Sequence, residues 1–238
     1  MKKPAENSLR VLEGKIIQCR QCRRLVHWRE KVGREKVKRF ANENYWARPV
    51  PGFGDHQARL LLVGLAPAAH GANRTGRMFT GDESGRWLYR ALYRAGFANT
   101  GESLHRDDGL VLKDCYITAS LRCAPPQNKP LPKELATCRP FLIDELGLLQ
   151  KVEIVVGLGK VGFETAVRAY REAGLISLQK KPVFRHGRVH RLDPFTFIAS
   201  YHPSQQNTFT GKLIEPMFDA VFRFAKQELS RSSRSSLH

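Results

Sequence analysis

The sequence lacks an apolar run of about 18 residues or more, so it predicts no membrane span. The lysines of its first ten residues, MKKPAENSLR, have no apolar stretch behind them, which disfavours a secretory signal. No internal repeat of fixed period is present. These absences predict an intracellular, cytoplasmic protein, in which reduced thiols serve metals or catalysis more often than disulfides.

Acidic residues are also scarce: 22 Asp and Glu stand against 40 Lys and Arg, for a formal charge of +18. Such an excess favours a polyanionic partner such as nucleic acid, although a general solubility charge is the simpler alternative. Clustering of the charge favours a binding face. The basic residues are concentrated at 20–39 (RQCRRLVHWREKVGREKVKR) and recur at Arg74, Arg77, Arg86, Arg90 and Arg94.

With 42 % hydrophobic residues, the 238-residue chain can bury a sizeable core, and we expect one domain over 1–229 with a disordered tail at 230–238. Apolar runs predict strands at 58–65, 115–121, 152–156 and 195–201. Helices are expected at 8–18, 28–40, 84–95, 133–150 (kinked or split by Pro140), 161–170 and 213–229, with a loop at 44–55. This alternation predicts an α/β fold with a central, mainly parallel four-stranded sheet covered on both faces.

Each predicted strand runs into a distinctive loop: GLAPAAHG, RCAPPQN, GLGK and YHPSQQN. Ligands of such folds bind beyond the carboxyl ends of the strands, so we expect these loops to meet at one site. The first loop continues to Asp82 as a polar, glycine-rich stretch that contains Phe79, which suits recognition of a flat ring, although an ordinary surface loop is the alternative. His202, held by Pro203 at a strand end, can donate a hydrogen bond to a developing anion, or it can be structural.

The segment Gly157–Gly162 (GLGKVG) matches a dinucleotide-binding fingerprint, follows a strand and opens a helix. That fingerprint requires an acidic residue about 20 positions further on, and residues 178–182 (LQKKP) contain none. We therefore interpret it as a tight strand-to-helix turn.

Four of the five cysteines form two separated pairs, Cys19 with Cys22 and Cys123 with Cys138. A fold that joins the pairs would make one cage of four thiolates. Zinc and an iron–sulfur cluster both use such a cage, and the wide second pair leans towards a [4Fe–4S] cluster. Cys115, inside a predicted strand, is expected to be a small core residue.

At these motifs the chain resembles the uracil-DNA glycosylase superfamily, in particular its cluster-containing family 5, with family 4 as the nearest relative. The resemblance is carried by GLAPAAHGANRTGRMFTGDESG at 64–85, LRCAPP at 121–126, HPSQQNTFTG at 202–211 and the four cysteines. It implies a three-layer α/β/α sandwich, a structural [4Fe–4S] cluster and excision of damaged bases from double-stranded DNA.

The resemblance also implies roles for single residues. Phe79 would stack on an extruded base, His202 would hydrogen-bond the base oxygen, and the loop 204–211 would push into the duplex. The candidate catalytic residues are Asp82 and His202. The candidate substrate contacts come from Gly64, Ala66, Pro67, Ala68, Phe79, Ala119, Asn128 and Ser204.

The chain departs from its wider superfamily at three positions. Leu65 and Ala66 stand where relatives carry a polar residue that positions water, so we assign that task to Asp82. Ala119 replaces an asparagine that reads the uracil edge in family 4, with Asn128 as a partial substitute. A pocket without that amide should accept uracil and other deaminated bases such as hypoxanthine.

We therefore expect a monomeric, nucleoid-associated base-excision-repair enzyme of prokaryotic type that hydrolyses the N-glycosidic bond and leaves an abasic site. No lysine stands in a motif as an obvious Schiff-base nucleophile, which predicts no lyase activity. A non-catalytic nucleic-acid-binding protein with an architectural metal site is the main alternative. A nucleotide-dependent oxidoreductase that uses GLGKVG is a third.

Overall fold

The computed structural model describes residues 4–235, and these form an α/β fold around one six-stranded sheet. The strand order is β1-β3-β2-β4-β6-β5. The strands are β1 (Phe53–Gly54), β2 (Leu60–Gly64), β3 (Cys115–Ala119), β4 (Ile154–Leu158), β5 (Val189–Leu192) and β6 (Phe195–Ser200).

The four inner strands are parallel to one another, as the apolar runs predict. The expectation of only four strands is wrong, because β1 and β5 add an antiparallel edge on each side. Both edge strands are half-buried and short, so neither has the continuous apolar sequence that marks a strand buried on both faces. β1 lies inside the segment 44–55 that the sequence predicts as loop.

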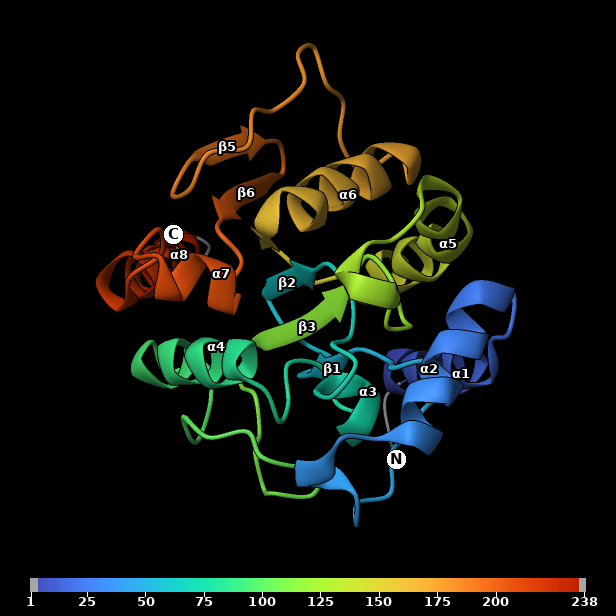
Figure 1. Ribbon diagram of the computed structural model, residues 1–238. Helices are drawn as coiled ribbons and strands as arrows, with labels where there is room; N and C mark the ends of the chain where they lie inside the picture. Colours follow the sequence, from blue (N-terminus) through green and yellow to red (C-terminus); the bar gives the residue numbers. More distant parts are fainter. Residues whose placement is uncertain (1–3, 236–238) are drawn as a thin grey trace.

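Helices occupy the connections from β2 to β3, from β3 to β4 and from β4 to β5, and the two ends of the described chain (Figure 1). They are α1 (Pro4–Gln18), α2 (Arg23–Glu35), α3 (Ala72–Thr75), α4 (Glu83–Arg94), α5 (Pro132–Leu148), α6 (Gly159–Glu172), α7 (Gln205–Phe209) and α8 (Glu215–Ser235), with 3-10 turns at Lys38–Phe40 and Pro126–Asn128.

Several helices differ from their predicted form. α5 is one helix with Pro140 inside it, so the proline does not split the element. The loop expected at 204–211 contains the short helix α7. α8 continues through 230–235, where the sequence predicts a disordered tail, and residues 236–238 lie outside the described part of the chain.

Two hydrophobic clusters lie on opposite faces of the sheet, because successive strand residues alternate in direction. Leu60 and Leu62 of β2 belong to the cluster that includes residues of α4 and α8, whereas Leu61 and Val63 belong to the cluster that includes residues of α1, α5 and α6. Figure 1 shows α4 and α8 on one side of the sheet and α5 and α6 on the other. Cys115 is fully buried in the first cluster, as predicted.

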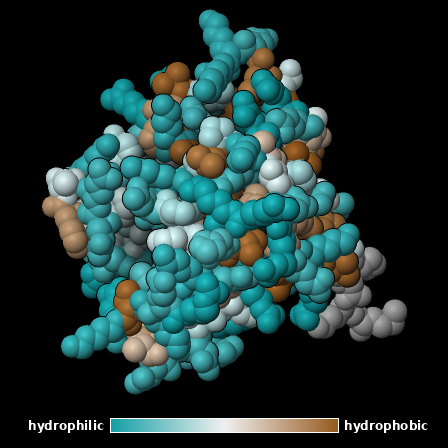
Figure 2. All heavy atoms as spheres, turned by 45° about the vertical axis from the view of Figure 1, so that its right-hand side comes forward, coloured by the Kyte–Doolittle hydropathy of each residue, from teal (hydrophilic) through white to brown (hydrophobic). Residues whose placement is uncertain are grey.

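The face drawn in Figure 2 is largely hydrophilic, with hydrophobic residues in small separate groups. Among residues 4–235, no helix combines the length and the apolar character that a membrane crossing requires.

Candidate functional site

Loops at the carboxyl ends of the inner parallel strands meet, as the sequence predicts. The Ser120 N–H after β3 donates to the Gly64 carbonyl at 2.9 Å, and the Leu121 N–H donates to the Leu65 carbonyl at 3.0 Å. On the other side, Gly159 of α6 lies so close to His202 that a Cβ atom on the glycine would be 3.2 Å from the histidine Cβ. The loops after β2, β3, β4 and β6 are thus neighbours.

Phe79 and His202 form the centre of this site. Their ring centroids are 5.7 Å apart and their planes are inclined by 31°. Gly64 supports the phenyl ring from below, since a Cβ atom there would lie 3.0 Å from two ring carbons. Phe79 also has a φ of 52°, a left-handed conformation that is strained for a bulky side chain and that often occurs at functional sites. Phe79 and His202 are both only partly buried as whole residues.

The environment of His202 keeps its imidazole uncharged near neutral pH. Burial lowers the pKa of this histidine to about 4, because a poorly solvated ring disfavours the added charge. Its backbone carbonyl accepts a hydrogen bond from the Asn207 side-chain amide at 2.8 Å, which fixes the turn from β6 into α7. A neutral imidazole at this place can donate one N–H to an oxygen that becomes negative.

Asp82 has a structural function: it is the N-cap of α4. Its Oδ1 atom accepts the Gly85 N–H at 2.8 Å. Its Oδ2 atom lies against Gly71, which has no room for a side chain there, so the carboxylate joins the end of the first motif loop to the helix. Burial raises the pKa of Asp82, partly offset by the hydrogen bonds from Gly85 and Ser84.

The other predicted contact residues are distributed around this centre. Ala119 is the last residue of β3, buried and paired with Gly64 of β2, and Ser204 is the N-cap of α7. Ala66, Pro67 and Ala68 form the loop that leaves β2. Asn128 differs, because it lies in an exposed 3-10 turn, and no recorded contact within residues 4–235 joins its amide to Phe79 or His202.

A second site is the cavity that all four predicted metal-ligand cysteines line together. Cys19 and Cys22 come from the connection between α1 and α2, Cys123 from the loop after β3, and Cys138 from α5. Arg29 of α2 reaches into the same cavity, where its Nη1 atom lies 2.9 Å from the Cys123 sulfur. Within the described residues, no three His, Cys, Asp or Glu side chains are close enough to hold a single metal ion.

The donors around this cavity fit a thiolate-bound cluster. Four thiols are the ligand set of a [4Fe–4S] cluster. Arg29 and Arg122 line the cavity and are buried, and the Arg29 Nε atom and the Arg122 Nε and Nη1 atoms have no hydrogen-bond partner. Buried, unsatisfied cationic donors beside four sulfur atoms suit a group of negative charge. Burial raises the pKa of the Cys123 thiol to about 11 and of the Cys138 thiol to about 12.

The basic residues do not all belong to one exposed face. Arg74 and Arg77 are only 6 % and 4 % exposed and are paired with Glu43 and Asp108, so their predicted place on a binding face is wrong. Hydropathy and spacing cannot distinguish these buried arginines from exposed ones, because their partners lie 31 residues away in the sequence.

The glycines of the GLGKVG segment serve packing, and β4 runs straight into α6, which confirms the predicted turn. A Cβ atom on Gly157 would lie 2.3 Å from the Phe163 Cα, and one on Gly162 would lie 2.4 Å from the Val63 carbonyl oxygen. No sequence motif reveals the contact of Gly159 with His202. Its positive φ of 82° belongs to a strand-to-helix turn, and only the tertiary fold places that turn beside His202.

Comparison with known proteins identifies the family of this chain. The profile of the Uracil DNA glycosylase superfamily matches residues 51–228, and the chain belongs to this superfamily. Within it, the chain belongs with the type-5 enzymes. It is 49% identical over 222 residues to the type-5 uracil-DNA glycosylase of Mycobacterium leprae, which covers 92% of this chain and 95% of that protein.

Two further relatives show how the similarity declines. The type-5 uracil-DNA glycosylase of Thermus thermophilus is 50% identical over 212 residues, covering 88% of this chain and 93% of that protein. A type-4 uracil-DNA glycosylase of Thermotoga maritima is 30% identical over 156 residues, covering 65% of this chain and 69% of that protein.

Proposed function

We propose that this protein is a uracil-DNA glycosylase that hydrolyses the N-glycosidic bond of uracil in double-stranded DNA and leaves an abasic site. The observation that carries the proposal is the pair of Phe79 and His202 at the carboxyl edge of the sheet, partly exposed and supported by Gly64 and Gly159. Similarity to the type-5 enzymes over about nine-tenths of the chain supports the same activity.

The geometry suggests how the reaction proceeds. The nucleotide leaves the duplex, and its base stacks on Phe79 in the space beside His202. The bond between the sugar C1′ and the base nitrogen breaks, and its electron pair moves onto the base. The neutral His202 imidazole then donates a hydrogen bond to the base oxygen that carries the charge. Water adds to the cationic sugar at C1′, the proton that it loses neutralises the released base anion, and Asp82 orients that water or stabilises the cation.

Substrate breadth follows from what the pocket lacks. The positions where relatives carry polar groups are occupied by Leu65, Ala66 and Ala119, which present no side-chain amide or carboxylate to a base. A pocket that does not read the uracil edge rejects other bases poorly. We therefore include hypoxanthine among the substrates. Activity restricted to uracil would contradict this part of the proposal.

Contacts with the duplex would come from exposed basic and apolar residues near the site. α2 exposes Arg23 and Arg34, which can pair with phosphates, whereas Arg24 is paired with Glu134. The Phe209 side chain at the end of α7 is 75 % exposed, in the segment that the resemblance assigns to insertion into DNA. An exposed aromatic ring there can occupy the gap that an extruded base leaves.

The thiol cavity would hold a [4Fe–4S] cluster through Cys19, Cys22, Cys123 and Cys138. Such a cluster supplies a covalent cross-link between distant segments and can exchange one electron. Here the cross-link would tie the N-terminal helices α1 and α2 to the loop after β3 and to α5. Zinc would give the same cross-link without colour.

The two core clusters on opposite faces of the sheet support a three-layer α/β/α sandwich and one domain that includes 1–229. We also propose a monomer that works in the cytoplasm at the nucleoid.

The test uses purified protein and duplexes that each contain one lesion. We expect release of free uracil and an alkali-labile site, with slower release of hypoxanthine. Tight, salt-sensitive binding without base release from any duplex would identify a non-catalytic binding protein instead.

A further inference from the structure

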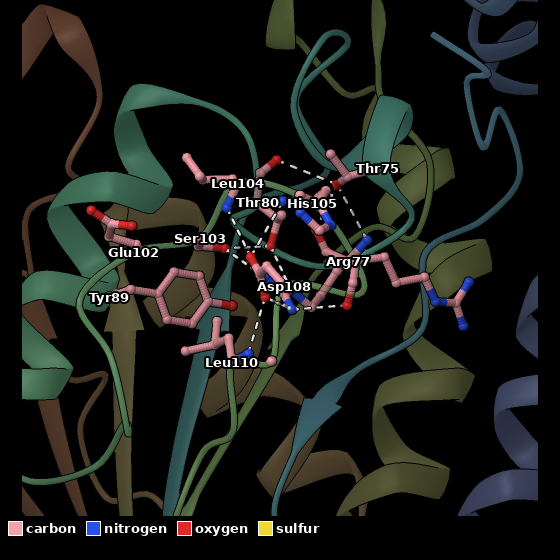
Figure 3. A network of polar contacts seen from close by, with 12 residues as sticks. Thr75, Arg77, Thr80, Tyr89, Glu102, Ser103, Leu104, His105, Asp108 and Leu110 are labelled. Atoms are coloured by element: carbon pink, nitrogen blue, oxygen red, sulfur yellow. Dashed lines mark hydrogen bonds and ion pairs between the residues drawn. The ribbon is translucent and has the colours of Figure 1, made fainter.

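A buried network of polar side chains holds the segment that carries Phe79. Its centre is the ion pair of Arg77 with Asp108, with Nη1–Oδ1 and Nη2–Oδ2 distances of 2.8 and 2.6 Å (Figure 3). Arg77 and Asp108 are 4% and 11% exposed. Asp108 also accepts the backbone N–H groups of Leu104 and Leu110 at 2.9 and 3.0 Å, so the segment 104–110 folds around it.

The same network bonds to the residues on both sides of Phe79. The Arg77 Nε atom donates to the Thr80 Oγ1 atom at 2.9 Å, and the Thr80 and Ser103 hydroxyl oxygens are 2.7 Å apart. The Ser103 carbonyl accepts the Gly81 N–H at 3.0 Å. The Tyr89 hydroxyl of α4 donates to the Met78 carbonyl at 2.8 Å. Met78, Thr80 and Gly81 are therefore all fixed by groups outside the motif.

Phe79 needs this support because its backbone is strained. At a φ of 52°, the segment would relax to an ordinary conformation unless its surroundings prevented it. Such a change would rotate the Phe79 side chain away from Gly64 and from His202, the two groups that define the base-stacking position. Neither Asp108 nor Ser103 is among the residues that line the thiol cavity, and neither has a recorded contact with His202.

We propose that Asp108 and Ser103 are positioning residues, which act through Arg77 and Thr80 to hold Phe79 in its strained, base-stacking conformation. The inference rests on the proposed function. It extends the site to the connection between α4 and β3, which no sequence motif marks.

A double-mutant cycle tests it, using the full-length protein and a duplex with one uracil. Asp108→Asn should slow single-turnover uracil release at least 10-fold while the Kd for DNA changes less than 3-fold. In a Phe79→Ala background, the same substitution should change the rate less than 2-fold, because no ring is left to position. Equal effects in the two backgrounds, or an unchanged rate in Asp108→Asn alone, would overturn the inference.

Asp114→Asn is the matched control. Asp114 also pairs with an arginine, at 2.5 Å from the Arg59 Nη2 atom, and accepts the Arg59 backbone N–H, but it lies at the opposite end of the sheet, before β3. It should lower thermal stability and leave the rate within 2-fold. If Asp108→Asn does not fold, Ser103→Ala replaces it in the double-mutant cycle, because this substitution removes only one hydroxyl. Equal effects of Ser103→Ala in the two backgrounds, or an unchanged rate in Ser103→Ala alone, would then overturn the inference.

A second readout separates this inference from the proposed activity. The fluorescence of 2-aminopurine placed beside the uracil rises when the uracil leaves the stack. If the wild-type protein raises the fluorescence but releases no base, the glycosylase activity is refuted. The double-mutant cycle of Asp108 and Phe79 would then use the fluorescence change in place of the rate. A rise that Asp108→Asn leaves unchanged would overturn the positioning role, and no rise with the wild-type protein would overturn both.

Discussion

Asp82 combines a helix cap with the predicted catalytic carboxylate, and the two functions can be separated at this one residue. Asparagine caps a helix as well as aspartate does, so Asp82→Asn should leave α4 stable while it removes the charge. We expect single-turnover uracil release to fall at least 100-fold, with little change in DNA binding. Asp82→Ala should in addition lose about 1 kcal/mol of stability. Unchanged release in Asp82→Asn would remove this residue from the mechanism.

The buried imidazole of His202 predicts a dependence of stability on pH. Its folded pKa of about 4 lies below the unfolded value of 6.5, so the unfolded chain takes up a proton first as the pH falls. This residue should therefore cost about 2 kcal/mol of stability between pH 7 and pH 5. Between pH 7 and pH 5, denaturant unfolding should show a smaller loss of stability for His202→Gln than for the wild type. The exposed control His27→Gln should lose as much stability as the wild type. Parallel curves for His202→Gln and wild type would contradict the assignment.

The residues of the site could be predicted from sequence only where a motif contains them. Phe79 and His202 stand in long, specific motifs, and the structure places their rings together. Asp108 stands in a loop without regular pattern, and its contact with Arg77 depends on how the loop folds back. The exposed position of Asn128 could not be predicted either, because hydropathy does not reveal that this residue lies in a 3-10 turn with a left-handed φ of 56°.

At the scale of elements, the packing of α6 on β2 depends on a glycine without room for a side chain. Gly162→Ala would place a Cβ atom 2.4 Å from the Val63 carbonyl oxygen, a backbone atom that cannot move away easily. We expect a loss of at least about 2 kcal/mol in the free energy of unfolding. Gly147→Ala on α5 is the matched control, because nothing lies within 4 Å of the place that its Cβ atom would take, and it should gain about 0.5–1 kcal/mol. A neutral Gly162→Ala would show that α6 can shift freely.

The inner strands were predictable because burial on both faces requires a continuous apolar sequence, as in LLLVG of β2. The edge strands were not, since each shares only one side of its backbone with a neighbour and remains half-buried. α7 was missed for a related reason: its five residues, QQNTF, include none that is buried and so carry no helical pattern of apolar side chains.

At the scale of the whole molecule, the positive charge predicts a steep loss of DNA affinity with salt. Each phosphate contact contributes about 0.9 to the slope of log K against log salt concentration. Arg34→Gln, on the exposed part of α2, should lower that slope by about this amount. Arg191→Gln on the edge strand β5 serves as the control, because Arg191 is paired with Glu228 away from the site, and its slope should remain that of the wild type. Equal slopes for Arg34→Gln and wild type would exclude Arg34 from the DNA interface.

The cysteine cavity predicts that metal and fold are linked. Anaerobically purified protein should be brown and contain about four iron and four sulfide per chain, in line with a cluster on four cysteines. Cys19→Ala should lose most of the iron and unfold at a lower temperature, because α1 and α2 are no longer tied to α5. Cys115→Ala, a substitution in the core, is the control and should keep its iron. A colourless wild type with one bound zinc would establish the alternative metal.

The proposed base-stacking site draws its parts from distant stretches of chain: Gly64 ends β2, Gly159 opens α6 after β4, and His202 follows β6. A chain still emerging from the ribosome lacks the imidazole until nearly all of it has been made. Partly synthesised or truncated molecules can therefore bind DNA through their positive charge without releasing a base. Base release is then a measure of complete folding as well as of chemistry.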